Sequence, residues 1–202
     1  MKQNNKNGTL YMVKLALMIA IIFIMAFTPL GYFHTLGLDI TFLTVPVAVG
    51  AIILGPKGGA ICGLAFGITS FMQALMGSSA FSAMLFNINP VGTAFTCLVP
   101  RVLEGWLCGL LFPAVRKISK NGAYFAASLA CPLLNTFFFM SSLVLIFYHT
   151  EYIQGFVETL GVTNPLMFVV AFVGTQGLVE AVACTLISSM VSRTLGAALK
   201  QG

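Results

Sequence analysis

Long apolar segments, separated by short polar, glycine-containing or proline-containing breaks, run along the whole sequence. Each segment is bounded by Gly, Pro, Asn or a charged residue, which is where helices commonly begin and end. Most segments approach or exceed the roughly 20 residues with which a helix crosses the hydrocarbon core of a bilayer. The pattern therefore predicts an all-α integral membrane protein, a single domain of residues 1–202, with six transmembrane helices at about residues 10–32, 41–54, 58–76, 94–115, 123–147 and 165–195.

The composition agrees with a membrane protein and excludes an ordinary soluble fold. Of the 202 residues, 58% are hydrophobic and only 7% are charged. The net charge of +5 does not indicate nucleic-acid binding, because the sequence has no basic stripe with interleaved aromatic residues. The five cysteines lie inside apolar segments without CxxC spacing, and the two histidines are isolated in loops, so no metal site is predicted.

The distribution of charge along the chain predicts its orientation in the membrane. With the N-terminus inside the cell, every Lys and Arg except Arg101 falls on the inner side. The outer loops contain three acidic residues, Asp39, Glu151 and Glu158, and no Lys or Arg. Both termini are therefore expected to be cytoplasmic. The longest connections, residues 31–40, 77–93 and 148–164, then lie outside and favour a ligand site near the outer face.

Arg101, Glu104 and Glu180 are ionisable residues inside predicted spans, where charged groups are rare and usually functional. Arg101 and Glu104 share one face of the fourth helix because they are three residues apart. Gln176 lies one turn before Glu180, and Asn135 lies on a polar stripe of the fifth helix. We therefore expect a substrate-binding site formed by Arg101, Glu104, Asn135, Gln176 and Glu180. In the alternative interpretation, Arg101 pairs with Glu104 or Glu180, and the two amides only link helices.

Two further pairs of residues have two interpretations each. Asn87 and Asn89 precede the fourth helix and either bind the ligand or cap the helix and shape a turn; we include both in the candidate site. Gln73, near the outer end of the third helix, is equally ambiguous. Ala16 and Ala20 form a small-xxx-small pair on the first helix, which serves either packing inside the chain or a surface for a partner.

Several sequence motifs of enzymes do not occur in the chain. It has no GxxxxGK[ST] loop, no GxSxG elbow and no HExxH helix, so we assign no catalytic residue and no cofactor. An intramembrane enzyme with Glu104 or Glu180 as acid or base would need a second catalytic partner, which the sequence does not show. A membrane scaffold would not need an inward-facing Arg101. Any uphill transport would need other subunits.

Three motifs resemble a known family over nearly the whole chain. They are the Ala16-xxx-Ala20 pair, the run Ile52-Ile53-Leu54-Gly55-Pro56-Lys57-Gly58-Gly59-Ala60, and Pro100-Arg101-Val102-Leu103-Glu104-Gly105. With these motifs the sequence resembles the substrate-binding subunit, or S component, of an energy-coupling factor (ECF) vitamin transporter. The Thr28-Pro29-Leu30-Gly31 turn and the Gly-Pro-Lys-Gly-Gly linker are most similar to pantothenate-type members.

The resemblance implies a function and a set of partners. It implies a six-helix bundle in a prokaryotic cell membrane, which binds a small water-soluble vitamin at its outer end under lids from the loops after the first and third helices. It also implies that Ala16 and Ala20 face a transmembrane coupling subunit driven by two ATPase subunits. Pantothenate fits a positively charged Arg101. If Glu104 neutralises Arg101, a neutral vitamin such as riboflavin or a pyridoxine-like compound fits instead.

Overall fold

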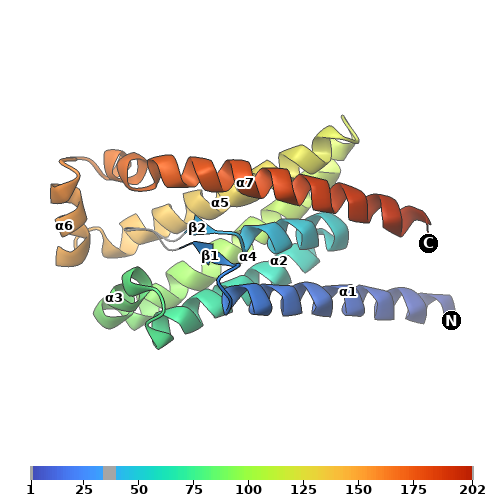
Figure 1. Cartoon of the computed structure of the whole chain (residues 1–202), viewed down its shortest axis with the longest axis horizontal. Coiled ribbons are helices and arrows are strands. Elements are labelled where there is room, and N and C mark those ends of the chain that lie inside the picture. Colours follow the sequence, from blue (N-terminus) through green and yellow to red (C-terminus); the bar gives the residue numbers. More distant parts are fainter. Residues whose placement is uncertain (1, 34–39, 202) are drawn as a thin grey trace.

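The computed structural model describes residues 2–33 and 40–201 and shows an elongated bundle of helices (Figure 1). Strand β1 (Tyr32–Phe33) pairs with β2 (Ile40–Thr41) in a small antiparallel ribbon, with Tyr32 opposite Thr41. The helices are α1 (Lys2–Ala26), α2 (Thr44–Met76), α3 (Ala80–Ile88), α4 (Pro90–Arg116), α5 (Gly122–Phe147), α6 (Glu151–Thr159) and α7 (Pro165–Gln201).

The predicted helical membrane protein is confirmed, but the count of six full spans is not. Within the described residues, five helices are long and apolar enough to cross a membrane. They contain the segments Gly8–Ala26, Thr44–Met76, Pro90–Arg116, Gly122–Phe147 and Gln176–Leu199.

The expected break between the helices at 41–54 and 58–76 is observed at Gly55, where α2 folds back on itself, and the difference in count comes from the first of its two arms. Gly55 has a φ of 78° and a ψ of −171°, which is not helical, and Pro56 follows it. A Cβ atom added to Gly59 would lie 2.8 Å from the Cβ of Ala51, whereas residues eight apart in a straight helix are separated by about 12 Å. Residues 44–54 and 56–76 are therefore two antiparallel arms (Figure 1). The first arm has little more than half of the roughly 20 residues that a straight span needs.

Three glycines in the second arm of α2 allow it to pack directly on the backbone of α4. A Cβ atom on Gly59 would clash with the carbonyl oxygen of Gly105, and one on Gly63 would clash with that of Arg101. Gly67 approaches α4 in the same way one turn later. The spacing of four residues on both helices keeps the contact in register, as small residues do between helices in membranes.

Several predicted boundaries are wrong, and each has a local cause. The first helix ends at Ala26 and not at Tyr32, because Pro29 disfavours helical backbone in the residue before it. The predicted loops at 77–93 and 148–164 contain α3 and α6. Both are short helices whose apolar residues recur at helical spacing and are buried in one cluster, namely Phe81 and Leu85, and Ile153 and Val157.

The two ends of the bundle differ in structure. Both termini, the fold-back at Gly55 and the loop at 117–121 lie at one end, and α3 and α6 lie at the other (Figure 1). One hydrophobic cluster includes Leu43, Phe66 and Phe112, and a second, at the α3 and α6 end, includes Phe81 and Phe147. A polar cavity lies where the two clusters meet, because its walls include residues of both.

Candidate functional site

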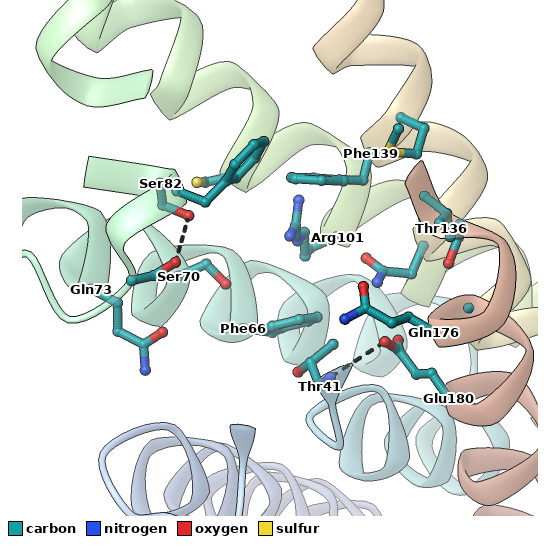
Figure 2. Close-up of a pocket in the computed structure, with 17 residues that line it drawn as sticks. Thr41, Phe66, Ser70, Gln73, Ser82, Arg101, Thr136, Phe139, Gln176 and Glu180 are labelled. Carbon is teal, nitrogen blue, oxygen red and sulfur yellow. Dashed lines mark hydrogen bonds between the residues drawn. The ribbon is translucent and has the colours of Figure 1, made fainter. Parts of the chain in front are cut away.

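A cavity of about 100 Å³ lies inside the bundle, between α2, α3, α4, α5 and α7 (Figure 2). One water molecule needs only about 10–15 Å³ of such space, so the cavity holds more than a single water. Its apolar walls include Phe66, Phe81, Phe139, Met140 and Val173. Its polar lining consists of Thr41, Ser70, Gln73, Ser79, Ser82, Arg101, Asn135, Thr136, Gln176 and Glu180.

Arg101 is held in this cavity by two aromatic rings and one carbonyl group. Figure 2 shows its guanidinium between Phe66 and Phe139, and its Cζ atom lies 5.3 Å and 4.5 Å from the centres of these rings. Its Nη1 donates a hydrogen bond of 2.6 Å to the carbonyl oxygen of Thr96. Its Nε has no hydrogen-bond partner among the described residues. A guanidinium has five N–H donors, so donors are left for a ligand.

The predicted alternative, in which Arg101 pairs with a glutamate, is not observed. The described contacts of its guanidinium are with Thr96, Phe66 and Phe139, and none of them is with the carboxylate of Glu104 or Glu180. The side chain is only 8% exposed, so bulk water does not satisfy its remaining donors. Its remaining donors are therefore available to a hydrogen-bond acceptor inside the cavity.

Glu180 and Gln176 enter the cavity from α7, one turn apart (Figure 2). Oε2 of Glu180 accepts a hydrogen bond of 3.3 Å from the backbone N–H of Thr41, which connects α7 to β2. Oε1 of Glu180 is buried and has no partner among the described residues. The same holds for Oδ1 of Asn135 on α5. These two oxygens can accept hydrogen bonds from ligand donors.

Glu104 does not line the cavity, although it was expected to do so. It is fully buried, and its Oε1 accepts a hydrogen bond from the thiol of Cys131 at 3.6 Å. The same thiol lies 3.6 Å from the carbonyl oxygen of Thr44, in the first arm of α2. Residues three apart share a helix face but differ by about 4.5 Å in depth, which places Glu104 beyond the floor of the cavity.

Asn87 and Asn89 also lie away from the cavity. Both side chains are exposed. Oδ1 of Asn89 accepts a hydrogen bond of 2.9 Å from the backbone N–H of Gly92, so this residue is the N-cap of α4. Capping was one of the two interpretations of the sequence, and it is the one that the structure shows for Asn89.

The sequence interpretation missed several residues of the cavity. Phe66 and Phe139, which enclose the guanidinium, were not assigned to the site, and Thr41 and Ser70 were not singled out; Phe139 was expected only as a member of the stripe that contains Asn135. Gln73 lines the cavity, and its Nε2 donates a hydrogen bond of 2.5 Å to the carbonyl oxygen of Ala26 at the end of α1. The signal was present as helical spacing: Phe66, Ser70 and Gln73 recur at intervals of four and three residues in α2, and Phe139 follows Asn135 by four.

Two other expected features lie elsewhere in the molecule. Ala16 and Ala20 are exposed on α1, which packs mainly on α2. The expected lid after the first helix falls at residues 31–40, of which 34–39 lie outside the described residues. The expected lid after the third helix contains α3, and its Ser79, Phe81 and Ser82 line the cavity.

The fold is that of a polytopic helical membrane protein, and its buried polar cavity is the candidate site for a small molecule. The chain belongs to the substrate-specific components of ECF transporters, because the family described as "ECF transporter, substrate-specific component" matches residues 10–192. It is therefore a multi-pass protein of the bacterial cell membrane and a transporter component.

Two relatives of the chain are named for pantothenate. The pantothenate transporter PanT of Leuconostoc mesenteroides is 32% identical over 113 residues, which cover 54% of this chain and 53% of that protein. The pantothenic acid transporter PanT of Lactococcus lactis subsp. cremoris is 31% identical over 166 residues, covering 75% of this chain and 74% of that protein. The match thus spans about half of the first relative and about three quarters of the second.

Proposed function

We propose that this protein is the pantothenate-binding subunit of an ATP-driven ECF importer. The observation that carries the proposal is the buried guanidinium of Arg101. It lines the cavity, and no ion pair with a glutamate is described for it. Pantothenate has a carboxylate at one end, and arginine binds carboxylates with two parallel, charge-assisted hydrogen bonds. The names of the two PanT relatives support the same ligand.

The remaining polar groups of the cavity suit the rest of the vitamin. Pantothenate has two hydroxyl groups and a central amide, which together need acceptors and donors. Oε1 of Glu180 and Oδ1 of Asn135 are buried acceptors without a described partner. The side-chain amides of Asn135 and Gln176 can also donate to the carbonyl group of the ligand.

A neutral vitamin is the competing ligand class. It would follow if Glu104, one turn away on α4, neutralised Arg101. The hydrogen bond described for Glu104 comes from Cys131, and the one described for Glu180 comes from Thr41. A neutral ligand would leave the buried donors of Arg101 without an anion, which is unfavourable for a buried cation.

The energy for import comes from other subunits in this proposal. The sequence has no nucleotide-binding loop of its own. Ala16 and Ala20 are exposed on α1 and allow another helix to approach closely. They form the surface on which the transmembrane coupling subunit docks, and two ATPase subunits drive that subunit.

Thermal unfolding with a panel of vitamins tests the ligand class. A ligand that binds only the folded state at 100 times its Kd stabilises that state by about 2.7 kcal/mol. Pantothenate should therefore raise the Tm of the purified protein, while riboflavin and pyridoxine at equal concentrations should not. A rise with riboflavin or pyridoxine, or no rise with pantothenate, would contradict the proposal.

A further inference from the structure

An apolar groove lies on the outside of the helix bundle, between α4 and α5. Its volume is about 670 Å³, and it is lined only by aliphatic residues and one phenylalanine. The lining runs from Leu107 to Ala114 on α4 and from Ala130 to Phe137 on α5. Seven steps of 1.5 Å give it a length of about 10 Å, a third of the hydrocarbon thickness of a bilayer.

The groove opens to the outside of the helix bundle. Leu110, Leu133 and Phe137 on its walls are 43%, 49% and 64% exposed. Ala114 and Ala130 carry only a methyl group each, so the surface is hollow where larger side chains would fill it. A wall of this composition offers only dispersion contacts, which suit a hydrocarbon chain.

A basic loop follows the part of α4 that lines the groove. Ala114 lies less than one turn before Arg116, where α4 ends and the loop to α5 begins. Lys117 and Lys120 are in the loop, and all three cations are exposed. The sequence from Gly105 to Thr150 contains no Asp or Glu, so no acidic residue nearby in the chain compensates this charge.

We propose that the groove and the basic loop together form a binding site for an anionic phospholipid. An acyl chain lies along the groove between α4 and α5, and the phosphate headgroup contacts Lys117 and Lys120. Basic clusters at the membrane surface attract anionic lipids, and long lysine side chains extend to the headgroup region while their methylenes stay on apolar surface.

The position of the groove argues against the coupling subunit as its occupant. The exposed alanines of the proposed docking surface are on α1, which packs mainly on α2, and the groove is formed by α4 and α5. The loop at 117–121 lies at the same end of the bundle as both termini, where the positive-inside rule places the inner leaflet (Figure 1). The site is independent of which vitamin the cavity binds.

Native mass spectrometry of the purified full-length protein tests the site. The probes are palmitoyl-oleoyl phosphatidylglycerol and the phosphatidylcholine with the same acyl chains, titrated separately. We expect tighter binding of phosphatidylglycerol. Lys117→Gln with Lys120→Gln should weaken it by about fivefold for each lysine removed. The matched control, Lys14→Gln with Arg193→Gln, removes two charges elsewhere and should leave the preference unchanged.

Filling the groove tests the acyl-chain part of the site. Ala130→Trp should weaken the binding of both lipids several-fold, whereas Val182→Trp, at an exposed position of α7, should not. Ala114→Trp fills the same groove from α4 and serves as a second variant in case Ala130→Trp does not fold. The result is taken from the variant whose melting curve matches that of the wild-type protein.

Three outcomes would overturn the site. The first is equal binding of the two lipids to the wild-type protein. The second is an equal loss in the lysine double variant and in its charge control. The third is a groove variant that binds lipid normally but no longer assembles with a coupling subunit, which would assign the groove to a protein partner.

Discussion

At the scale of single residues, the orientation of Arg101 depends on its neighbours. The carbonyl oxygen of Thr96 accepts from one nitrogen, and the guanidinium lies between the rings of Phe66 and Phe139. The faces of aromatic rings attract a cation electrostatically. The side chain is thus fixed before a ligand arrives, and less conformational entropy is lost on binding.

Phe139→Leu should therefore weaken pantothenate binding without removing a hydrogen bond to it. Cation–π contacts contribute about 0.5–2 kcal/mol, so we expect a loss of about 2- to 30-fold in a calorimetric titration. Phe137→Leu is the matched control, because Phe137 is on the same helix and is 64% exposed. Equal losses in the two variants would show that the ring of Phe139 has no specific role.

Two buried glutamates differ in position: Glu180 lines the cavity and Glu104 does not. Glu180→Gln should weaken pantothenate binding about fivefold, because an NH2 group replaces one of the two carboxyl oxygens that can accept from a ligand hydroxyl. Glu104→Gln should leave the affinity within about twofold, because Glu104 lies outside the cavity. Tighter binding by Glu180→Gln would show that Glu180 repels the anion and does not accept from the ligand.

Four of the seven expected site residues line one cavity, and the other three do not. Arg101, Asn135, Gln176 and Glu180 could be predicted because polar groups in apolar helices must face inward. Glu104 shares the face of Arg101, but periodicity does not say how deep a cavity reaches. Asn87 and Asn89 precede a helix, and only the local hydrogen bonds show that Asn89 acts as a cap.

At the scale of helices, the close contact between α2 and α4 sets the position of the site. Gly63 lies against the backbone of Arg101 itself, so the distance between the two helices fixes the position from which the Arg101 side chain extends. The contact could be predicted from the spacing of Gly59, Gly63 and Gly67. The turn at Gly55 could also be predicted, because the Gly-Pro-Lys-Gly-Gly run separates the expected helices at 41–54 and 58–76. The short helices α3 and α6 depend on tertiary packing, which short segments do not reveal by their pattern alone.

Gly63→Ala should destabilise the protein, although alanine is the better helix former. The added methyl group would clash with the carbonyl oxygen of Arg101, and overpacking of this kind costs about 1–3 kcal/mol. Gly155→Ala in α6 is the matched control, because a Cβ atom there meets nothing within 4 Å. We expect a lower Tm for the first variant and an equal or higher Tm for the second. A normal Tm for Gly63→Ala would mean that the two helices can separate freely.

At the scale of the whole molecule, the candidate binding site and the proposed docking surface lie on different elements. The cavity lies between α2, α3, α4, α5 and α7, whereas Ala16 and Ala20 are exposed on α1. The two functions can therefore be separated by mutation. This arrangement suits a subunit that captures its ligand and leaves the energy supply to its partners.

Ala16→Leu with Ala20→Leu should spare pantothenate binding and stop uptake by cells that contain the ECF subunits. The larger side chains would keep the helices of the coupling subunit from approaching α1. Ala171→Leu, at an exposed position of α7, is the control and should transport normally. Uptake at the wild-type rate by the double variant would remove the proposed docking surface.

The central claim is that Arg101 recognises the carboxylate of pantothenate. Calorimetric titration with pantothenate and with pantothenol, in which an alcohol replaces the carboxylate, tests it most directly. The wild-type protein should bind pantothenate about 10- to 100-fold more tightly, as expected for hydrogen bonds to a charged group. Arg101→Ala should bind both ligands weakly and equally. Equal affinities in the wild-type protein, or an undiminished preference in Arg101→Ala, would contradict the account.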